Sequence, residues 1–240
     1  MNVLVTGASR GVGIAICRSL LEQGNKVYAI SRSFSSELKT LEKKYHGKLF
    51  FKSYDLSDTA NIHKVIFKEF IPNTIVVHGF VNNAATAYDD IITNLDLYQL
   101  EMMFRVNVYA PMMLTKYAIR NMIFNKTRGS IVHISSVSVH TGYKGLAMYA
   151  SSKGALEAFS KNTAREWGSK GIRSNVVVPG FMETAMSATL TTEQKEKIYN
   201  RTSLKIPTNI DSVAQTVSFM LSEKASSITG QNIHVDNGTI

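Results

Sequence analysis

Residues 2–13 read NVLVTGASRGVG, an apolar run that leads directly into a glycine-rich loop. The following stretch contains Ile14, Ile16, Leu20 and Leu21, and its pattern predicts an amphipathic helix. A strand, a glycine-rich turn and a helix in this order are typical of a dinucleotide-binding loop, because glycines let a phosphate approach the helix amino terminus. Without the strand and the helix, the glycine pattern would be a weak signal.

Short apolar runs alternate with longer amphipathic ones along the rest of the chain. We expect strands near 2–6, 26–31, 48–53, 74–81, 130–135, 172–178 and 232–235, with helices between most of them. Several of the runs are apolar almost throughout, as strands buried on both faces are. The pattern predicts an α/β fold with one doubly wound, Rossmann-type parallel sheet of about seven strands and helices on both faces. We expect a single domain over 1–240, with a small helical flap near 181–205 where the alternation breaks.

The composition places the chain in a broad class. Its 240 residues are 44% hydrophobic and 19% charged, which is typical of a globular protein with an ample core. No apolar run is long enough to span a bilayer, and the amino terminus enters a strand without a leader pattern, so we expect a cytoplasmic protein that does not bind membranes. Cys17 is the only cysteine, and its apolar helical context favours a buried thiol.

The charge of the chain indicates an anionic partner without identifying it. A formal net charge of +9 would suit a phosphate-bearing cofactor, an acidic protein or a nucleic acid. The lysines are dispersed, and Lys39, Lys43 and Lys44 have the spacing of a solvated helix face, so we expect no nucleic-acid partner. The six histidines do not cluster with carboxylates at metal-ligand spacing, and we assign no metal.

The end of the second expected strand bears on the choice between NAD and NADP. A carboxylate there would hold the ribose hydroxyls of NAD and repel a 2′-phosphate. The sequence has Ser31 and Arg32 instead, and Arg10 in the loop could reach the same phosphate, so we expect NADP(H). The alternative is that Arg32 is only a solvated surface residue. Asp55, after the third strand, could accept a hydrogen bond from the adenine amine or cap the next helix.

A second group of residues could carry acid–base chemistry. Tyr149 and Lys153 are four apart and would share one face of a helix. A nearby ammonium favours the phenolate and would bring a phenol of ordinary pKa about 10 into a useful range. Ser136 follows an apolar strand and would lie at its carboxyl end, where open α/β sheets bind ligands. Taken alone, such a Tyr–Lys pair is more often structural.

Six spaced motifs occur together in this chain. They are TGxxxGxG at 6–13, NNAA at 82–85, Asn107, Ser136, Tyr149-x-x-x-Lys153 and Pro179-Gly180-x-x-x-Thr184. In this order they resemble the short-chain dehydrogenase/reductase family, and the likeness extends from Thr6 to Gly238. Two positions depart from the family pattern. Ala85 stands where glycine is usual, and residues 235–238 read Val-Asp-Asn-Gly where Val-Asp-Gly-Gly is common.

The resemblance implies a role for each residue of the catalytic set. Tyr149 would donate the proton to a carbonyl, and Lys153 would lower the pKa of Tyr149 and hold the nicotinamide ribose. Ser136 would orient the substrate oxygen, and Asn107 would connect Lys153 through water to a proton relay. The strand order 3-2-1-4-5-6-7 is implied in the same way.

The cofactor contacts that we expect extend over the whole carboxyl edge of the sheet. The family uses the stretch at Asn82 for the adenosine side, and the residues after Pro179 for the carboxamide and phosphates. The expected contacts are Gly7, Ser9, Arg10, Gly11, Val12, Gly13, Ser31, Arg32, Asp55, Leu56, Asn83, Ala84, Tyr149, Lys153, Pro179, Gly180 and Thr184.

Within the family, the last third is most similar to the 3-oxoacyl-[acyl-carrier-protein] reductases, through GFMET at 180–184 and SITGQ at 227–231. This implies NADP(H)-dependent reduction of a ketone to a secondary alcohol in fatty acid biosynthesis, with an acidic carrier protein steered by a basic rim near the mouth of the site. Lys170 matches a docking position of these reductases, and Arg128 lies beside a second one, which is Thr127 here.

Other substrates stay open, because many family members that act on sugars, polyketides, steroids or small ketones share this pattern. The flap at 181–205 and the loop at 138–147, with His140 and Tyr143, would line the substrate pocket. A protein that binds NADP(H) without turnover is a remoter alternative.

The methionines at 102, 103, 112, 113 and 122 suit adaptable packing in the core or at a subunit contact. The resemblance implies a homotetramer or homodimer.

Overall fold

Seven parallel strands form one sheet in the order β3-β2-β1-β4-β5-β6-β7, in a computed structural model that describes residues 1–183 and 191–240. The strands are β1 (Asn2–Thr6), β2 (Lys26–Ser31), β3 (Leu49–Ser53), β4 (Gly79–Asn82), β5 (Gly129–Ile134), β6 (Ile172–Pro179) and β7 (Asn232–Val235). The fold class and the strand order are therefore confirmed.

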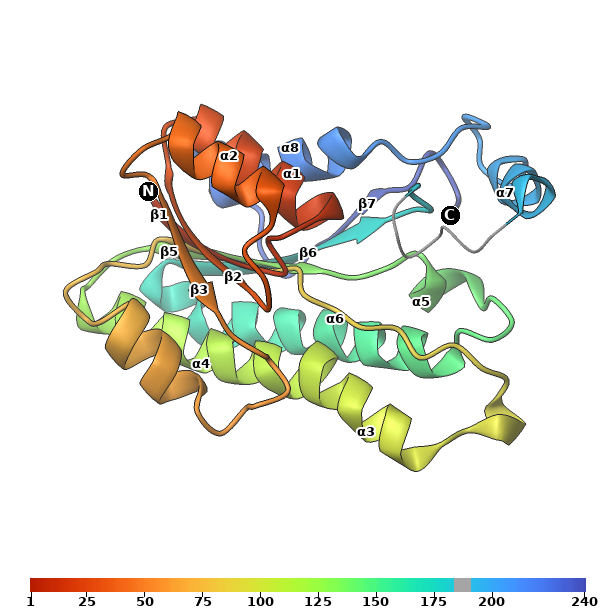
Figure 1. The fold of residues 1–240 in the computed structure, drawn as a ribbon, viewed down its shortest axis with the longest axis horizontal. Helices are drawn as coiled ribbons and strands as arrows, with labels where there is room; N and C mark the ends of the chain where they lie inside the picture. Colours follow the sequence, from red (N-terminus) through yellow and green to blue (C-terminus); the bar gives the residue numbers. More distant parts are fainter. Residues whose placement is uncertain (184–190) are drawn as a thin grey trace.

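Helices cover both faces of this sheet (Figure 1). One face carries α1 (Gly11–Glu22), α2 (Ser36–Lys44) and α8 (Ile210–Leu221). The other carries α3 (Leu97–Phe104), α4 (Ala110–Phe124), α6 (Ala147–Trp167) and the π-helix η1 (His63–Phe70). The shorter elements are η2 (Ile92–Asn94), the π-helix η3 (Arg105–Tyr109), α5 (Ser138–Thr141), η4 (Gly168–Lys170), α7 (Thr192–Tyr199) and η6 (Glu223–Ala225).

Two apolar clusters form the core because successive residues of a strand point to opposite faces. On β1, Val3 and Val5 pack with α1 and α8, whereas Leu4 packs with α4 and η1 on the other side. Phe80 of β4 belongs to the second cluster and Val81 to the first. This double burial explains the nearly continuous apolar runs of the central strands.

One expected strand is shorter than the apolar run that suggested it. We expected a strand over 74–81, but β4 begins at Gly79. The reason is a side chain: Asn121 of α4 accepts a hydrogen bond from the Val77 amide at 2.9 Å and donates one to the Ile75 carbonyl at 3.1 Å. These backbone groups are thus satisfied by an amide side chain instead of a neighbouring strand.

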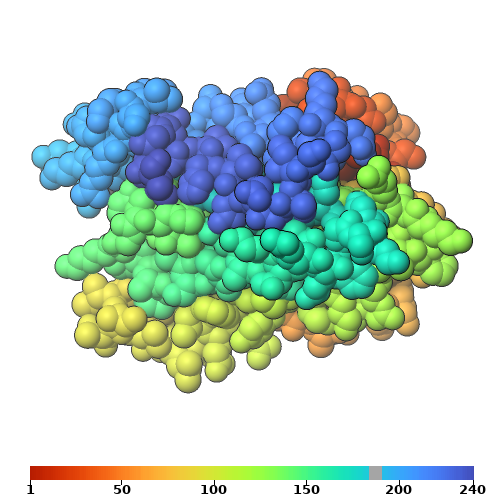
Figure 2. All heavy atoms as spheres, turned by 180° about the vertical axis from the view of Figure 1, so that it is seen from behind, coloured from red at the N-terminus to blue at the C-terminus, as the bar shows by residue number. Residues whose placement is uncertain are grey.

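The parallel arrangement brings all the carboxyl ends of the strands to one edge of the sheet. Figure 1 shows this edge on the right, where α5 and α7 lie and where the chain ends. From behind, Figure 2 shows the blue C-terminal third along one side, the green and blue-green middle third in the centre and the yellow segment that includes α3 on the opposite side. None of the helices described, outside 184–190, is both long and apolar enough to cross a bilayer.

Candidate active site

The glycine-rich loop joins the carboxyl end of β1 to α1. Gly7 and Gly11 have φ values of +65° and +55°, the left-handed region that glycine adopts without cost. Gly13 lies in the first turn of α1, and a Cβ atom there would be 2.0 Å from the Gly7 carbonyl oxygen. The loop therefore doubles back tightly against its own helix, as the spacing of the glycines predicted.

The side chain of Asn83 holds this loop in place. Its Nδ2 donates hydrogen bonds to the carbonyls of Thr6 and Gly7, at 3.0 and 3.1 Å. The backbone amides of Asn83 and Ala84 donate to the Thr6 hydroxyl at 3.1 and 3.2 Å. Asn83 was expected as a cofactor contact, and in the structure it also shapes the loop, because both of its amide hydrogens are used in these bonds.

The amino terminus of α1 suits a phosphate. Arg10 occupies the N-cap position with extended backbone, and no side chain in the described part of the chain caps the helix. The first-turn amides of a helix carry partial positive charge, so an anion at this position would be stabilised. The tight glycine turn keeps side chains out of the space in front of these amides. A dinucleotide pyrophosphate fits this arrangement.

The ends of β2 and β3 lie beside the loop and carry the residues expected to choose between NADP and NAD. Ser31 donates its hydroxyl hydrogen to the Ser33 carbonyl at 2.9 Å, and Arg32 is exposed at the end of β2. The pKa of Asp55 is lowered, first by the hydrogen bond from the Ser57 amide and further by the Arg32 guanidinium. The Arg32 guanidinium thus lies close enough to the Asp55 carboxylate for the two charges to interact.

One alternative for Asp55 is wrong. It does not cap the next helix, because its Oδ1 accepts a hydrogen bond from the Ser57 amide at 2.9 Å and closes a local turn. The N-cap residue of η1 is Ile62, and Asp58 accepts a hydrogen bond from the Asn61 amide at 3.3 Å in the turn before this helix. Leu56, between these turns, is buried in the core.

Tyr149 and Lys153 lie on α6, as their spacing predicted. The Lys153 Nζ is buried, donates to the Ile134 carbonyl at 2.8 Å and lies 5.8 Å from the centroid of the Tyr149 ring. Burial lowers the pKa of Lys153 to about 8. Burial and the nearby Asp89 carboxylate raise the pKa of Tyr149 to about 12.

The expectation that Lys153 lowers the pKa of Tyr149 is therefore not met. The physical reason is that burial destabilises the phenolate and the Asp89 carboxylate repels it, and both effects raise the pKa of Tyr149. The phenol stays protonated at neutral pH and can act as a proton donor.

Asn107 lies in the π-helix η3, between α3 and α4. Its Nδ2 donates to the Thr86 carbonyl at 2.8 Å and to the Ser152 hydroxyl at 3.0 Å, and its Oδ1 accepts from the Thr86 amide at 2.9 Å. Single π-turns often mark functional positions because they re-aim one side chain. Asn107 connects the loop after β4 to Ser152, the residue next to Lys153. Because these contacts occupy the Asn107 side chain, a link to Lys153 through water would use the Asn107 backbone.

Ser136 lies two residues after Ile134, the last residue of β5, whose carbonyl Lys153 binds. Its Oγ accepts hydrogen bonds from the amide and the hydroxyl of Ser138, at 3.2 and 2.9 Å. The side chain is half-buried and keeps its own hydroxyl hydrogen for another acceptor. Ser136 therefore lies at the carboxyl edge with a hydrogen-bond donor available.

The segment after β6 completes this edge. The Pro179 carbonyl accepts from the Val137 amide at 3.0 Å, and the Gly180 amide donates to the Val235 carbonyl at 2.9 Å. Thr184, an expected cofactor contact, lies outside the described residues, as does part of the expected flap at 181–205. The described part of the flap contains α7, which begins with a capping box between Thr191 and Gln194.

The expected basic rim is wrong for a single chain. Lys170 ends η4 just before β6, and Arg128 precedes β5, so both lie at the amino ends of the strands. A Cβ on Gly171 would be 3.0 Å from the Arg128 side chain, which places Arg128 beside the residue that follows Lys170. These cations lie at the opposite edge of the sheet from Ser136 because parallel strands all run the same way.

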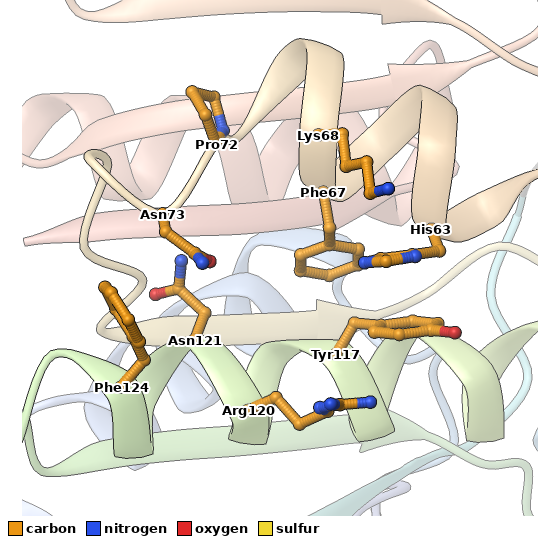
Figure 3. A pocket seen from close by; sticks show the side chains of 9 residues that line it. All are labelled: His63, Phe67, Lys68, Pro72, Asn73, Tyr117, Arg120, Asn121 and Phe124. Carbon is orange, nitrogen blue, oxygen red and sulfur yellow. The ribbon is translucent and has the colours of Figure 1, made fainter.

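A cavity away from this edge contains none of the expected site residues. Figure 3 shows it between η1 and α4, with the ring of His63 stacked on Tyr117 at 4.4 Å between centroids. Lys68 and Arg120 also line this cavity. Desolvation lowers the pKa of His63, and the positive charges of Lys68 and Arg120 lower it further.

Three residues at the edge have roles that the motifs did not reveal. Glu157 accepts a hydrogen bond from Ser135, Ser138 contacts Ser136, and Asp89 raises the pKa of Tyr149. Glu157 could have been found, because it is four residues after Lys153 on the same helix face. Asp89 lies in an irregular loop, and no spacing marks it.

The burial of Lys153 predicts a cost in stability that depends on pH. Between pH about 8 and the ordinary lysine pKa of 10.5, the unfolded chain keeps a proton that the folded chain has lost. The contribution of Lys153 to the free energy of unfolding should therefore rise with pH in this window. Replacing Lys153 with Met removes a desolvation cost of about 3 kcal/mol and a hydrogen bond of about 1 kcal/mol. We expect the cofactor-free Lys153→Met chain to melt a few degrees above wild type near pH 7.

The difference between the two melting temperatures should shrink as the pH approaches 10. Lys161→Met is the matched control, because Lys161 is exposed on the same helix. Equal pH dependence for wild type and Lys153→Met would show that Lys153 is charged in the fold throughout this range.

Comparison with known proteins shows likeness over nearly the whole chain. A family model described as enoyl-(acyl carrier protein) reductase matches residues 7–239. The L-xylulose reductase of Caenorhabditis elegans is 33% identical over 99% of this chain and 94% of its own length. A 3-oxoacyl-[acyl-carrier-protein] reductase of Buchnera aphidicola subsp. Schizaphis graminum is 34% identical over 99% of this chain and 96% of its own.

A solved structure of similar shape is a 4-hydroxyisoleucine dehydrogenase complexed with NADH. It superposes with a TM-score of 0.92 at 25% identity and covers 99% of this chain and 98% of that one. The likeness thus includes every strand of the sheet and the edge that carries the candidate site.

Proposed function

Because the chain belongs to the short-chain dehydrogenase/reductase family of oxidoreductases, we propose that it reduces a ketone to a secondary alcohol with NADPH. The observation that carries the proposal is the arrangement at the carboxyl edge: Tyr149 and Lys153 share one face of α6, and Ser136 follows the strand whose carbonyl Lys153 binds. A protonated phenol and a hydroxyl donor at one sheet edge can both address the oxygen of a carbonyl.

Each side chain has a separate part in this chemistry. A reduced nicotinamide, when bound at this edge, would be the source of the hydride. Ser136 donates a hydrogen bond to the carbonyl oxygen, and Tyr149 gives its Oη proton to the same oxygen, so that hydride and proton together make the alcohol. Lys153 lies 5.8 Å from the centroid of the Tyr149 ring and, by binding the Ile134 carbonyl, fixes α6 against the end of β5. Asn107 orients the helix around Lys153 through Ser152.

The residues present fit a nicotinamide dinucleotide. The glycine turn would bring the pyrophosphate to the amides of Gly11, Val12 and Gly13, with Ser9 beside them. Arg10 and Arg32 would bind the 2′-phosphate. The other expected contacts, from Ser31 to Gly180, would bind the rest of the dinucleotide along the same edge. A structural relative complexed with NADH supports a nicotinamide cofactor, and the cationic end of β2 supports the phosphorylated form.

Arg32 provides a test of the cofactor choice. Replacing Arg32 with Ala should raise the Kd of NADPH by roughly 10- to 100-fold, because a charge-assisted hydrogen bond to phosphate is lost. The Kd of NADH should change less than about twofold, because NADH has no 2′-phosphate. Binding can be followed by the fluorescence of the reduced nicotinamide.

Arg18→Ala is the matched control, since Arg18 is exposed on α1 away from the end of β2. If Arg32→Ala weakened NADPH and NADH equally, Arg32 would not recognise the phosphate, and the preference for NADP would lose its main support.

We propose a carrier-protein thioester as the substrate. The family description and the bacterial reductase relative both name acyl-carrier-protein chemistry, which supports this choice. The net charge of +9 would attract an acidic carrier protein. Docking through Lys170 and Arg128 would need a neighbouring subunit, since they lie at the far edge of their own chain. The homotetramer or homodimer expected from the family would provide one, and sedimentation would detect it.

A keto sugar is the second candidate substrate. The relative from Caenorhabditis elegans, named L-xylulose reductase, supports it at nearly the same identity as the bacterial enzyme. The two candidates share the same catalytic residues and differ only in what the flap and the loop at 138–147 would bind.

The deciding experiment is oxidation of NADPH, followed by its absorbance, with each substrate class in turn. The panel contains acetoacetyl thioesters of carrier protein and of coenzyme A, keto sugars and simple diketones, each repeated with NADH. Fastest turnover of the carrier-protein thioester would support the first candidate, and fastest turnover of a sugar the second. Tight binding of NADPH without reduction of any carbonyl would indicate a cofactor-binding protein without turnover.

A further inference from the structure

A buried carboxylate lies one helical turn beyond Lys153. Glu157 is only 9% exposed, and three side chains donate hydrogen bonds to it. Ser135 donates to Oε1 at 2.5 Å, the His140 Nε2 lies 3.1 Å from the same oxygen, and the Asn232 Nδ2 donates to Oε2 at 2.7 Å. Because a buried charge is costly unless hydrogen bonds satisfy it, this set of donors matches a carboxylate.

Glu157 and Lys153 hold two consecutive residues at the end of β5. Lys153 binds the Ile134 carbonyl, and Glu157 binds the Ser135 hydroxyl. The next residue is Ser136. Two side chains four apart on α6 therefore fix the backbone immediately before the hydroxyl that is proposed to bind the substrate oxygen.

Glu157 also holds the other end of this segment. His140 belongs to α5, whose first residue, Ser138, donates to the Ser136 Oγ at 2.9 Å. One carboxylate oxygen thus contacts the residue before Ser136 and a residue four positions after it. Ser136 lies on a short bridge, residues 135–140, that is attached to α6 at both ends.

A second carboxylate extends the contact to the C-terminal end of the chain. The rings of His140 and His234 meet edge to face at 4.9 Å, and the His234 Nδ1 lies 3.9 Å from Asp236. Figure 2 shows the dark blue C-terminal residues beside the green stretch that includes α5. Across residues 1–183 and 191–240, no three His, Cys, Asp or Glu side chains are arranged to hold a metal ion.

We propose that Glu157 is a positioning residue that sets the direction of the Ser136 hydroxyl by holding Ser135 and His140. This deepens the proposed function and rests on it, because Ser136 matters only if its hydroxyl meets the substrate oxygen. Glu157 does not itself reach substrate. Its effect on turnover should therefore be on the rate of the reaction and not on cofactor binding.

The test compares two replacements of Glu157. Met has a similar length and removes both acceptor oxygens. Gln keeps one oxygen, which can accept from Ser135 and His140. Its amide nitrogen then faces Asn232, which can turn its own amide so that its oxygen accepts a hydrogen bond. We expect kcat to fall about tenfold in Glu157→Met, with the Kd of NADPH changed less than about twofold, as for loss of a charge-assisted hydrogen bond. Glu157→Gln should recover kcat to within about threefold of wild type. Glu166→Gln, an exposed carboxylate on the same helix, is the control.

Ser135→Ala keeps the proposal testable if Glu157→Met does not fold. It removes one contact of Glu157 and should lower kcat about threefold, the effect of one neutral hydrogen bond. In the double variant Ser135→Ala/Glu157→Gln, kcat should be little lower than in the more impaired single variant, because both changes affect the same contact.

Two readouts separate failure of this proposal from failure of the proposed function. Amide exchange of residues 135–140 reports the attachment without substrate, and we expect it to rise at least about tenfold in Glu157→Met. Unchanged kcat in an active Glu157→Met or Ser135→Ala enzyme would overturn the role of Glu157 alone. A wild-type chain that binds NADPH and reduces nothing would overturn the proposed function, and the part given to Glu157 with it.

Discussion

Replacing Tyr149 with Phe is expected to lower kcat for carbonyl reduction by roughly 10²- to 10⁴-fold, the usual contribution of a positioned general acid. The phenyl ring keeps the packing on α6 but has no transferable proton. Because burial raises the pKa of Tyr149 to about 12, the wild-type phenol is protonated throughout the neutral range and is ready to donate. The Kd of NADPH should stay within about threefold, since at most one neutral hydrogen bond to the cofactor is lost.

Stopped-flow measurement of a single turnover tests this directly, because it separates the chemical step from product release. Tyr98→Phe is the matched control, since Tyr98 is 69% exposed on α3 and far along the chain from the site. A Tyr149→Phe enzyme that kept most of its single-turnover rate would show that the proton comes from another group or from water.

The fold was largely predictable because its signal repeats along the chain. Runs such as VLVTG and SNVVVP are buried on both faces, and their apolar character is visible without any partner. Spacing alone also placed Tyr149 and Lys153 on one helix face. The order of the strands was different: it came from the family resemblance, since periodicity does not say which strand pairs with which.

The parts that could not be predicted depend on contacts between distant segments. The hydrogen bonds of Asn83 to the loop connect residues 76 and 77 positions apart in sequence. Asn232 reaches Glu157 from 75 positions away. The pKa of Tyr149 was misjudged because a motif shows a neighbouring ammonium but not how deeply both groups are desolvated. Lys170 and Arg128 were wrongly expected near the mouth of the site. A match to a docking residue of related reductases does not say at which edge of the sheet that residue lies.

Replacing Gly13 with Ala should have the second large effect, on the cofactor loop. The new Cβ would lie 2.0 Å from the Gly7 carbonyl oxygen and 2.7 Å from the Asn83 Nδ2, so the loop has to move away from α1. Such overpacking against backbone costs roughly 3 kcal/mol, which lowers Tm by roughly 10 °C in a chain of this size. The same movement takes the loop amides out of line with a phosphate, and we expect the Kd of NADPH to rise at least about 100-fold.

Gly168→Ala separates this effect from the general consequence of replacing a glycine. A Cβ on Gly168 meets nothing within 4 Å, and its backbone is in the right-handed helical region at φ −57°. That change should leave NADPH binding untouched and alter stability by no more than about 1 kcal/mol. Calorimetry and titration with NADPH distinguish the two variants. If Gly13→Ala bound NADPH as tightly as Gly168→Ala, the contact between Gly13 and the Gly7 carbonyl would not determine the shape of the loop, and the pyrophosphate would have to bind elsewhere on this edge.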